Sequence, residues 1–161
     1  MLVVSDSTPL HYLVLIGEID LLRELYGTVV VPAAVVEELS ALQAPVEVRR
    51  WVADAPAWVT FAVPQPNVVL SHALGAGESA AIALARLSGN GILLTDDQQA
   101  RVVAESLGIQ VVPTIRILST ASALALVDLE DALKRLQATN FRVSRKVIEA
   151  VLNRKPIELQ E

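Results

Sequence analysis

Cysteine is absent from this chain of 161 residues. Its absence excludes disulfides, thiolate nucleophiles and metal sites built from cysteine. No apolar run approaches the roughly 18 residues that a membrane-spanning helix needs. The first residues, MLVVSD, lack the basic start and the long apolar stretch of a signal peptide. We therefore expect a cytoplasmic protein with no membrane partner.

Hydrophobic residues are abundant by contrast, at 53% of the chain with a mean hydropathy of +0.48. Without a membrane span, this excess favours strands that are buried on both faces, as in a parallel sheet. The length is that of one ordinary domain with a sizeable core. We expect a single domain over residues 1–161.

Charge is unevenly distributed along the chain. The net charge of −5 argues weakly against a general nucleic-acid binder. Residues 1–100 hold four Lys and Arg against eleven Asp and Glu. From residue 134 to residue 155 only Glu149 is acidic, and seven residues are basic: Lys134, Arg135, Arg142, Arg145, Lys146, Arg154 and Lys155. This basic end indicates either phosphate contacts or the solvated faces of helices.

Short apolar stretches alternate with helical patterns. Strands are predicted at 2–5, 28–31, 92–95 and 109–112, with a further short one at 58–63. Helices are predicted over 32–42, 46–55, 78–87 and 113–126, and between residues 8 and 27 with a break near Gly17. Thr8 is expected to cap the first helix, and Asp128 and Ser144 the last two. The pattern predicts an α/β fold with a mostly parallel sheet, a core over about 1–126 and a helical appendage over about 127–155.

Acidic residues follow two of the predicted strands directly. Asp6 follows the strand at 2–5, and Asp96 and Asp97 follow the strand at 92–95. Ligands of parallel α/β sheets bind outside the carboxyl ends of the strands. If these strands are neighbours, their acids lie together at that edge.

The helix predicted at 32–42 offers a third acid. Val35, Leu39 and Leu42 mark its buried face. At about 100° per residue, Glu38 lies at the margin of that face and Glu37 lies opposite it. Glu38 is therefore the acid expected to point toward the sheet edge.

Glu78 opens the helix predicted at 78–87. We expect Ser79 on the wet side of this helix and Leu87 on its buried side, which places Glu78 at the rim. The helix dipole alone also favours an acid in the first turn, so a purely structural role for Glu78 stays open.

Acids that converge must take up protons or bind a cation. Two carboxylates about 4 Å apart repel by roughly 4 kcal/mol at an effective dielectric constant of 20. Ligands that are all oxygen suit Mg²⁺ or Mn²⁺. Such an ion can bind a phosphodiester oxygen, activate water and stabilise the leaving oxygen. No histidine is required, and His11 and His72 are interpreted as ordinary residues.

Four stretches resemble the PIN-domain family of metal-dependent ribonucleases, and most closely its toxin-like prokaryotic subfamily. They are VVSDSTPLHYL, VVVPAAVVEEL, LGAGESAAIALA and ILLTDDQQARVVAESLGIQVV, which together span roughly residues 1–112. The later NFRVSRKVIEAVLNR resembles the end of that subfamily. A departure follows the last strand, where relatives tend to carry Gly-Thr and this chain has Pro113 and Thr114.

The resemblance implies a three-layer α/β/α sandwich with catalytic acids at Asp6, Glu38, Glu78 and Asp96, and with Asp97 as a substitute or helper ligand. It implies RNA cleavage that depends on Mg²⁺ or Mn²⁺, in the toxin half of a toxin–antitoxin pair with an antitoxin protein as partner. The high apolar content favours a homodimer.

Two other functions are compatible with the sequence. GAGESA, at 75–80, matches the Gly-x-Gly-x-x-Ala form of the dinucleotide fingerprint, and Asp96 lies about 20 residues further on. Glu78 would then stand in the turn that must receive a pyrophosphate, which disfavours this function. The other is a non-catalytic module that binds nucleic acid or protein.

Overall fold

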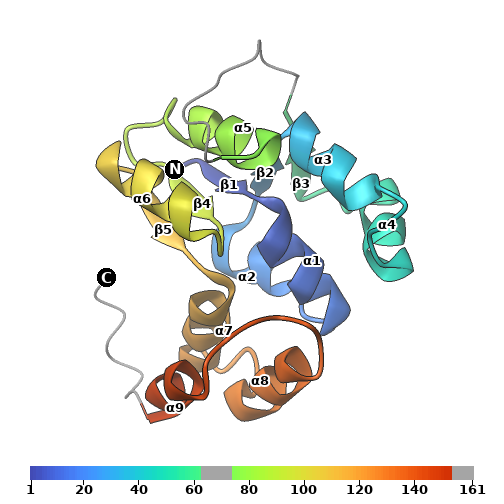
Figure 1. Cartoon of the computed structure of the whole chain (residues 1–161), viewed down its shortest axis with the longest axis vertical. Coiled ribbons are helices and arrows are strands. Elements are labelled where there is room, and N and C mark those ends of the chain that lie inside the picture. Colours follow the sequence, from blue (N-terminus) through green and yellow to red (C-terminus); the bar gives the residue numbers. More distant parts are fainter. Residues whose placement is uncertain (63–73, 154–161) are drawn as a thin grey trace.

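A computed structural model describes residues 1–62 and 74–153 of the chain. At its centre lies a sheet of five parallel strands in the order β3-β2-β1-β4-β5 (Figure 1). The strands are β1 (Val3–Ser5), β2 (Val29–Val31), β3 (Val59–Phe61), β4 (Ile92–Leu94) and β5 (Gln110–Val112). The order changes direction at β1, between β2 and β4, and such a switch point is where ligands of open α/β sheets bind.

Both faces of the sheet are buried. Val3 and Leu94 point into the larger hydrophobic cluster, and their neighbours Val4 and Leu93 point into the smaller one on the opposite face. This alternation follows from the twofold side-chain period of a strand. It explains why the strands carry continuous runs of Val, Ile and Leu, as the hydropathy of the chain indicated.

Helices cover the two faces of the sheet. The smaller cluster contains side chains of α5 (Ala76–Ala85) and α6 (Gln98–Ser106). The larger one contains side chains of α1 (Ser7–Leu15), α2 (Leu21–Tyr26), α3 (Ala33–Ser40), α4 (Val46–Ala53) and α7 (Thr114–Ala123). The predicted three-layer α/β/α sandwich with a parallel sheet is confirmed.

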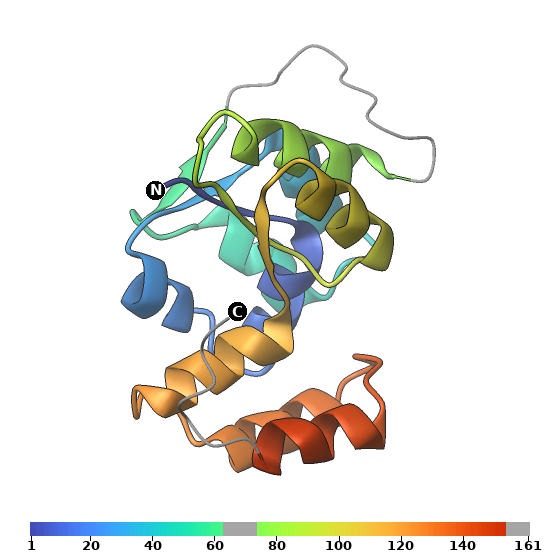
Figure 2. The same cartoon turned by 90° about the vertical axis from the view of Figure 1, so that its left-hand side faces the viewer.

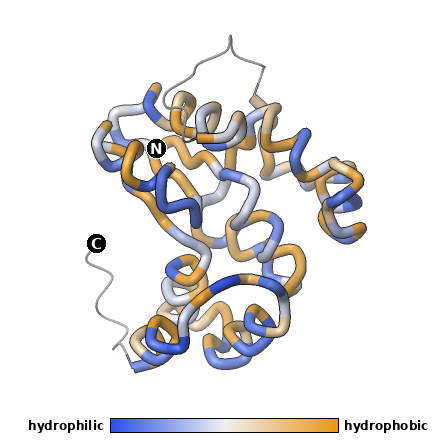
Figure 3. The backbone as a smooth tube through the Cα atoms, in the orientation of Figure 1, coloured by the Kyte–Doolittle hydropathy of each residue, from blue (hydrophilic) through white to orange (hydrophobic). Residues whose placement is uncertain are grey.

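The last two described helices lie beyond α7, away from the sheet (Figures 1 and 2). They are α8 (Leu129–Gln137) and α9 (Arg145–Asn153). Hydrophobic residues dominate the central strands in Figure 3, whereas α8 and α9 alternate between hydrophobic and hydrophilic positions. Ile148 is the buried residue of α9, so this helix presents most of its surface to solvent.

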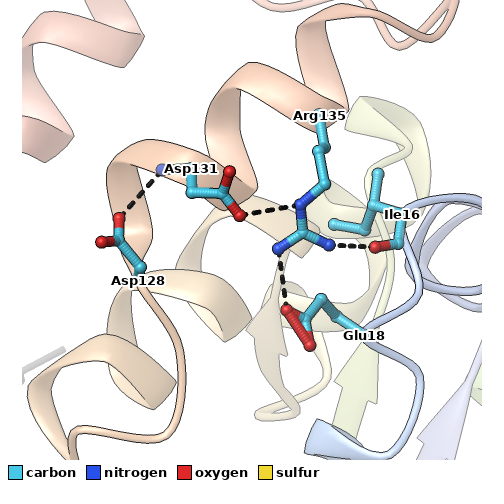
Figure 4. A network of polar contacts seen from close by, with 5 residues as sticks. All are labelled: Ile16, Glu18, Asp128, Asp131 and Arg135. Atoms are coloured by element: carbon cyan, nitrogen blue, oxygen red, sulfur yellow. Dashed lines mark hydrogen bonds and ion pairs between the residues drawn. The ribbon is translucent and has the colours of Figure 1, made fainter.

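Arg135 fastens α8 to the body of the protein (Figure 4). Its guanidinium donates to Glu18 Oε2 at 2.9 Å and to Asp131 Oδ2 at 3.0 Å, and also to the carbonyl oxygen of Ile16. Asp128 caps the same helix by accepting from the Asp131 N–H at 2.9 Å. One arginine thus joins α8 to the turn between α1 and α2.

Several predicted helix ends are confirmed. Gly17, with a φ of 75°, ends the first helical stretch, and Ser144 Oγ accepts from the Val147 N–H near the start of α9. The prediction that Thr8 caps α1 is wrong. Asp6 is the N-cap, and its side chain accepts from the Ser7 N–H.

Three predicted side-chain positions are also wrong. Leu42 is 86% exposed because α3 ends at Ser40 and its C-cap, Ala41, is extended. Leu87 is 77% exposed because α5 ends at Ala85. Ser79 is buried, on a helix that contacts both α3 and α6. Among the described residues, no helix has the length and apolarity to cross a bilayer.

Candidate metal centre

Asp6 stands at the carboxyl end of β1, at the switch point of the sheet. Its backbone N–H donates to the carbonyl oxygen of Leu94 at 2.9 Å, which ties the end of β1 to the end of β4. Its carboxylate accepts from the Ser7 N–H at 2.7 Å and from Thr95 Oγ1 at 2.9 Å. The residue is only 2% exposed, so these donors hold the carboxylate in one orientation.

Glu38 and Glu78 bring two more carboxylates to Asp6. They come from α3 and α5, which pack against each other (Figure 1). One carboxylate oxygen from each of Asp6, Glu38 and Glu78 lies within 4.8 Å of the others. Asp6 is buried, Glu78 is half-buried and Glu38 is exposed, so this carboxylate triad opens to solvent on the side of Glu38. Glu37 is exposed, as predicted.

Neighbouring backbone and hydroxyl groups orient the two glutamates. Ser7 Oγ donates to Glu38 Oε2 at 2.7 Å. Glu78 Oε1 accepts from the Gly75 N–H at 3.4 Å, within a capping box at the start of α5. Glu78 therefore has the capping position in the first helical turn where an acid is favoured. This position does not account for the presence of Asp6 and Glu38 beside this residue.

Gly77 leaves the space that Glu38 occupies. A Cβ atom on Gly77 would overlap Glu38 Oε1. The nearest neighbour of a Cβ on Gly75 would be a Glu78 oxygen at 3.2 Å, which is only a tight contact. Any side chain at residue 77 would therefore push the Glu38 carboxylate away from its position.

The triad is electrostatically strained. The pKa of Asp6 is raised to about 7, chiefly because the carboxylate is buried. The charges of Glu78 and Glu38 raise it further, and the hydrogen bonds from Ser7 and Thr95 oppose the rise. A carboxyl group with such a pKa holds a proton over part of the physiological pH range, and a cation among the three acids would displace that proton.

The donor set of the triad suits a hard divalent cation. Three carboxylates supply only oxygen ligands and up to three negative charges, the combination that Mg²⁺ and Mn²⁺ prefer. The open side at Glu38 leaves room for water or a substrate oxygen, as catalytic metal sites require. The residues present therefore fit a divalent metal.

Asp96 is not a member of the triad. Its carboxylate accepts from the Thr114 N–H at 2.9 Å and from Thr114 Oγ1 at 2.5 Å, at the start of α7. Burial raises the pKa of Asp96, and these two hydrogen bonds lower it. Asp96 thus joins the end of β4 to the first turn of α7, and a ligand role for it stays a prediction.

Asp97 is the N-cap of α6. Its Oδ1 accepts from the Ala100 N–H at 2.8 Å, and its own N–H donates to Thr95 Oγ1 at 3.1 Å. Thr95, which is 1% exposed, therefore links Asp97 to Asp6. A helper role at a metal stays a prediction for Asp97 too, with its carboxylate used as a helix cap in the structure.

The sequence reasoning overlooked Ser7, Thr95 and Gly77. Ser7 and Thr95 adjoin acids in VVSDS and LLTDD, and a hydroxyl beside a carboxylate at a strand end is a usable signal for a positioning group. Gly77 lies in GAGESA, whose glycines were interpreted only as part of a possible dinucleotide fingerprint. In the structure both Glu78 and Glu38 lie against that glycine-rich turn, so the site for a pyrophosphate holds negative charge instead.

The remaining sequence predictions have mixed outcomes. His11 is half-buried and lies against Tyr12, with ring centroids 4.5 Å apart. His72 and the basic residues Arg154 and Lys155 lie outside the described residues. In the basic C-terminal part, ion pairs engage Lys134, Arg135 and Arg145. The pairs of Lys134 and Arg145 lie within α8 and α9, and of these three only Arg135 also pairs, among the described residues, with an acid outside its own helix, Glu18.

Comparison with known proteins gives one informative match. A family model described as a PIN domain matches residues 2–155, which is nearly the whole chain. No curated protein and no solved structure gives a significant match. The matched range includes all three residues of the carboxylate triad as well as Asp96, Asp97 and the C-terminal helices.

Proposed function

Because the chain belongs to the PIN-domain family, we propose that it is a nuclease that hydrolyses RNA with the help of Mg²⁺ or Mn²⁺. One observation carries this proposal, the convergence of Asp6, Glu38 and Glu78 within 4.8 Å. Bound metal would supply charge stabilisation for a phosphodiester and a more acidic water. In this proposal the three residues of the triad hold the metal.

The three residues would contribute differently. Asp6 is buried and held by two donors, so it is the rigid anchor of the site. Without metal, Asp6 carries a proton for part of the time near pH 7, and binding of a cation would release it. Glu38, exposed and oriented by Ser7, stands where a substrate would arrive.

Asp96 completes the proposed set as a fourth catalytic acid. Asp96 directly follows Thr95, and the Thr95 hydroxyl donates to Asp6. Asp96 is therefore adjacent in sequence to a residue that contacts the triad. To bind a metal or a water there, its carboxylate would have to exchange the bonds that it receives from Thr114. For Asp97 the cap on α6 is the stronger assignment.

The likeness to toxin-like PIN domains adds a biological role, a partner and an oligomeric state to the proposal. The chain would act as the toxin of a toxin–antitoxin pair, with a small antitoxin protein as its inhibitor and a homodimer as its working form.

The decisive experiment compares two neighbouring glutamates of α3. Labelled RNA is incubated with the purified protein in Mn²⁺, in Mg²⁺ and in EDTA. We expect cleavage with either metal and none in EDTA. Glu38→Gln should lower the rate by more than about 100-fold, because it removes a charged ligand without changing volume. Glu37→Gln, one residue away and exposed, should cleave like the wild type.

Equal cleavage by the two variants would place the activity elsewhere or in a contaminant. If the folded wild-type protein cleaves no RNA in either metal, the alternative of a non-catalytic binding module replaces the proposal. Micromolar binding of NAD without any metal dependence would favour the dinucleotide function of GAGESA.

A further inference from the structure

A large pocket opens beside the candidate metal centre. Its volume is about 1170 Å³, and it lies between the carboxyl end of β4, helix α7 and the segment that leads into α9. Asp96 and Thr8 line it at one end, and Val147 and Val151 of α9 line it at the other. No triad residue lines the pocket, but its lining residue Asp96 directly follows Thr95, whose hydroxyl donates to Asp6 at 2.9 Å. The lining therefore runs from the neighbourhood of the triad to α9.

Two arginines in this pocket make no ion pair with the acids of the described residues. Arg101, Arg116 and Arg142 all line it. Arg101 pairs with Glu105 at 2.9 Å, but within residues 1–62 and 74–153 neither Arg116 nor Arg142 makes an ion pair. They differ in this respect from Lys134, Arg135 and Arg145 of the nearby helices. Two unneutralised guanidinium groups attract an anionic ligand, and planar guanidinium suits phosphate oxygens.

The pocket also has an aromatic wall. Tyr12 and Phe141 pack edge to face with ring centroids 4.9 Å apart, and both line the pocket. Tyr12 Oη donates to Asn140 Oδ1 at 2.8 Å, which holds the ring against the segment before α9. Cationic groups beside aromatic rings form the surface on which single-stranded nucleic acids bind, with phosphates on the charges and bases on the rings.

We propose that this pocket receives the single strand of RNA that flanks the cleaved bond. The strand would place one phosphate at the carboxylate triad, further phosphates at Arg116 and Arg142, and an unpaired base against the wall of Tyr12 and Phe141. A duplex hides its base faces and cannot use this wall. This inference rests on the proposed function, since it takes the triad as the point of cleavage.

The test measures strand binding without metal, so that cleavage plays no part. A fluorescein-labelled single-stranded oligoribonucleotide of mixed sequence is titrated with protein in EDTA, and anisotropy is recorded between 50 and 200 mM salt. The variant is Arg116→Gln/Arg142→Gln. We expect it to bind about tenfold more weakly at low salt. The slope of log K against log salt should flatten by about 1.4, or about 0.7 for each lost phosphate contact on a single strand.

The matched control is Arg50→Gln/Arg86→Gln. Both residues are exposed, and neither forms an ion pair in the described parts of the chain. This variant changes the net charge by the same amount but lies on α4 and at the end of α5, outside the pocket. It should bind the strand within about twofold of the wild type. If the pocket variant fails to fold, Arg142→Gln alone, at an exposed residue, gives the same comparison with half the change in slope.

A second variant tests the aromatic wall. Phe141→Leu keeps an apolar side chain but removes the flat ring, and it should weaken binding by about fivefold or more without changing the salt dependence. Equal loss in the pocket and control double variants would overturn the proposal, because the attraction would then come from the overall charge. Wild-type affinity in the pocket variant would also overturn the proposal, and the apolar wall of the pocket would then be a candidate contact for a protein partner. The cleavage assay with Glu38→Gln tests the proposed function independently of these binding measurements.

Discussion

Two sets of carboxylates stand at the same edge of the sheet and differ in what surrounds them. In the triad, three carboxylates from β1, α3 and α5 face one another. Asp96 and Asp97, which follow β4, point instead at the donors of α7 and α6. Hydrogen bonds alone do not separate the two sets, because Asp6 accepts two of them, as Asp96 does. The triad differs in that three carboxylates lie within 4.8 Å of one another, which concentrates negative charge.

The largest expected difference between the two sets lies in the pH dependence of stability. Burial raises the pKa of Asp6 to about 7 in the folded protein, from 3.8 for an unperturbed aspartate. Between these pH values the folded state keeps a proton that the unfolded state loses, so stability falls as pH rises from about 4 to 7. The loss contributed by Asp6 is at most about 4 kcal/mol for the full shift.

Asp6→Asn should remove this loss. In EDTA at pH 8, urea unfolding should show the variant to be more stable than the wild type by about 1–4 kcal/mol, while at pH 4 this difference should shrink to near zero. Added Mn²⁺ should stabilise the wild type and leave the variant almost unchanged. Asp97→Asn, which retains a capping side chain, should keep the wild-type pH profile. Parallel profiles for Asp6→Asn and the wild type would show that Asp6 is ionised in the folded protein without metal.

The next largest effect concerns the space beside Glu38. In Gly77→Ala the new Cβ would overlap Glu38 Oε1, so the carboxylate must turn away from the triad. We expect Mn²⁺ affinity, measured by calorimetry, to fall by roughly 10- to 100-fold. Stability without metal should hold or rise, because alanine favours a helix over glycine by up to about 1 kcal/mol.

Gly75→Ala provides the matched control for this change. Its Cβ would lie 3.2 Å from the Glu78 carboxylate, a contact that a small movement of a flexible side chain relieves. Its metal affinity should stay within a few-fold of the wild type. Equal affinity for Gly77→Ala and Gly75→Ala would mean that Glu38 is not a ligand, and the triad would be reduced to two acids.

Much of the fold follows from patterns within single segments. Runs such as ILL and VVV predicted the strands, and the helical period of about 100° per residue distinguished Glu38 from Glu37. The same period gave wrong positions for Leu42 and Leu87, because each helix ends before that residue. It also gave the wrong position for Ser79, which is buried on α5, a helix with neighbours in both α3 and α6. Helix ends depend on capping and lateral burial depends on neighbouring helices, and neither is contained in the period of one segment.

The candidate site divides in the same way. The positions of Asp6, Glu38 and Glu78 follow from local pattern together with the rule that ligands bind at the ends of strands. The partner of Asp96 does not, because Thr114 lies 18 residues further along the chain and its hydroxyl meets the carboxylate only after β5 has paired with β4. The contact between Gly77 and Glu38 likewise depends on how closely α3 and α5 pack. Sequence thus predicted which acids approach the sheet edge, and tertiary contacts decided which of them face one another and which face the first turn of another helix.

The smallest expected effect concerns Asp97, the member of the second set that caps α6. Asp97→Ala removes the side chain that accepts from the Ala100 N–H, and the loss of an N-cap costs about 1 kcal/mol of unfolding free energy. Urea unfolding in EDTA measures this loss, and Asp97→Asn or Asp97→Ser should restore most of it. Mn²⁺ affinity should be the same in all three variants, because the cap and the triad share only the hydroxyl of Thr95. A tenfold drop in Mn²⁺ affinity for Asp97→Ala would give Asp97 a part in metal binding, and the two sets of carboxylates would then form one site.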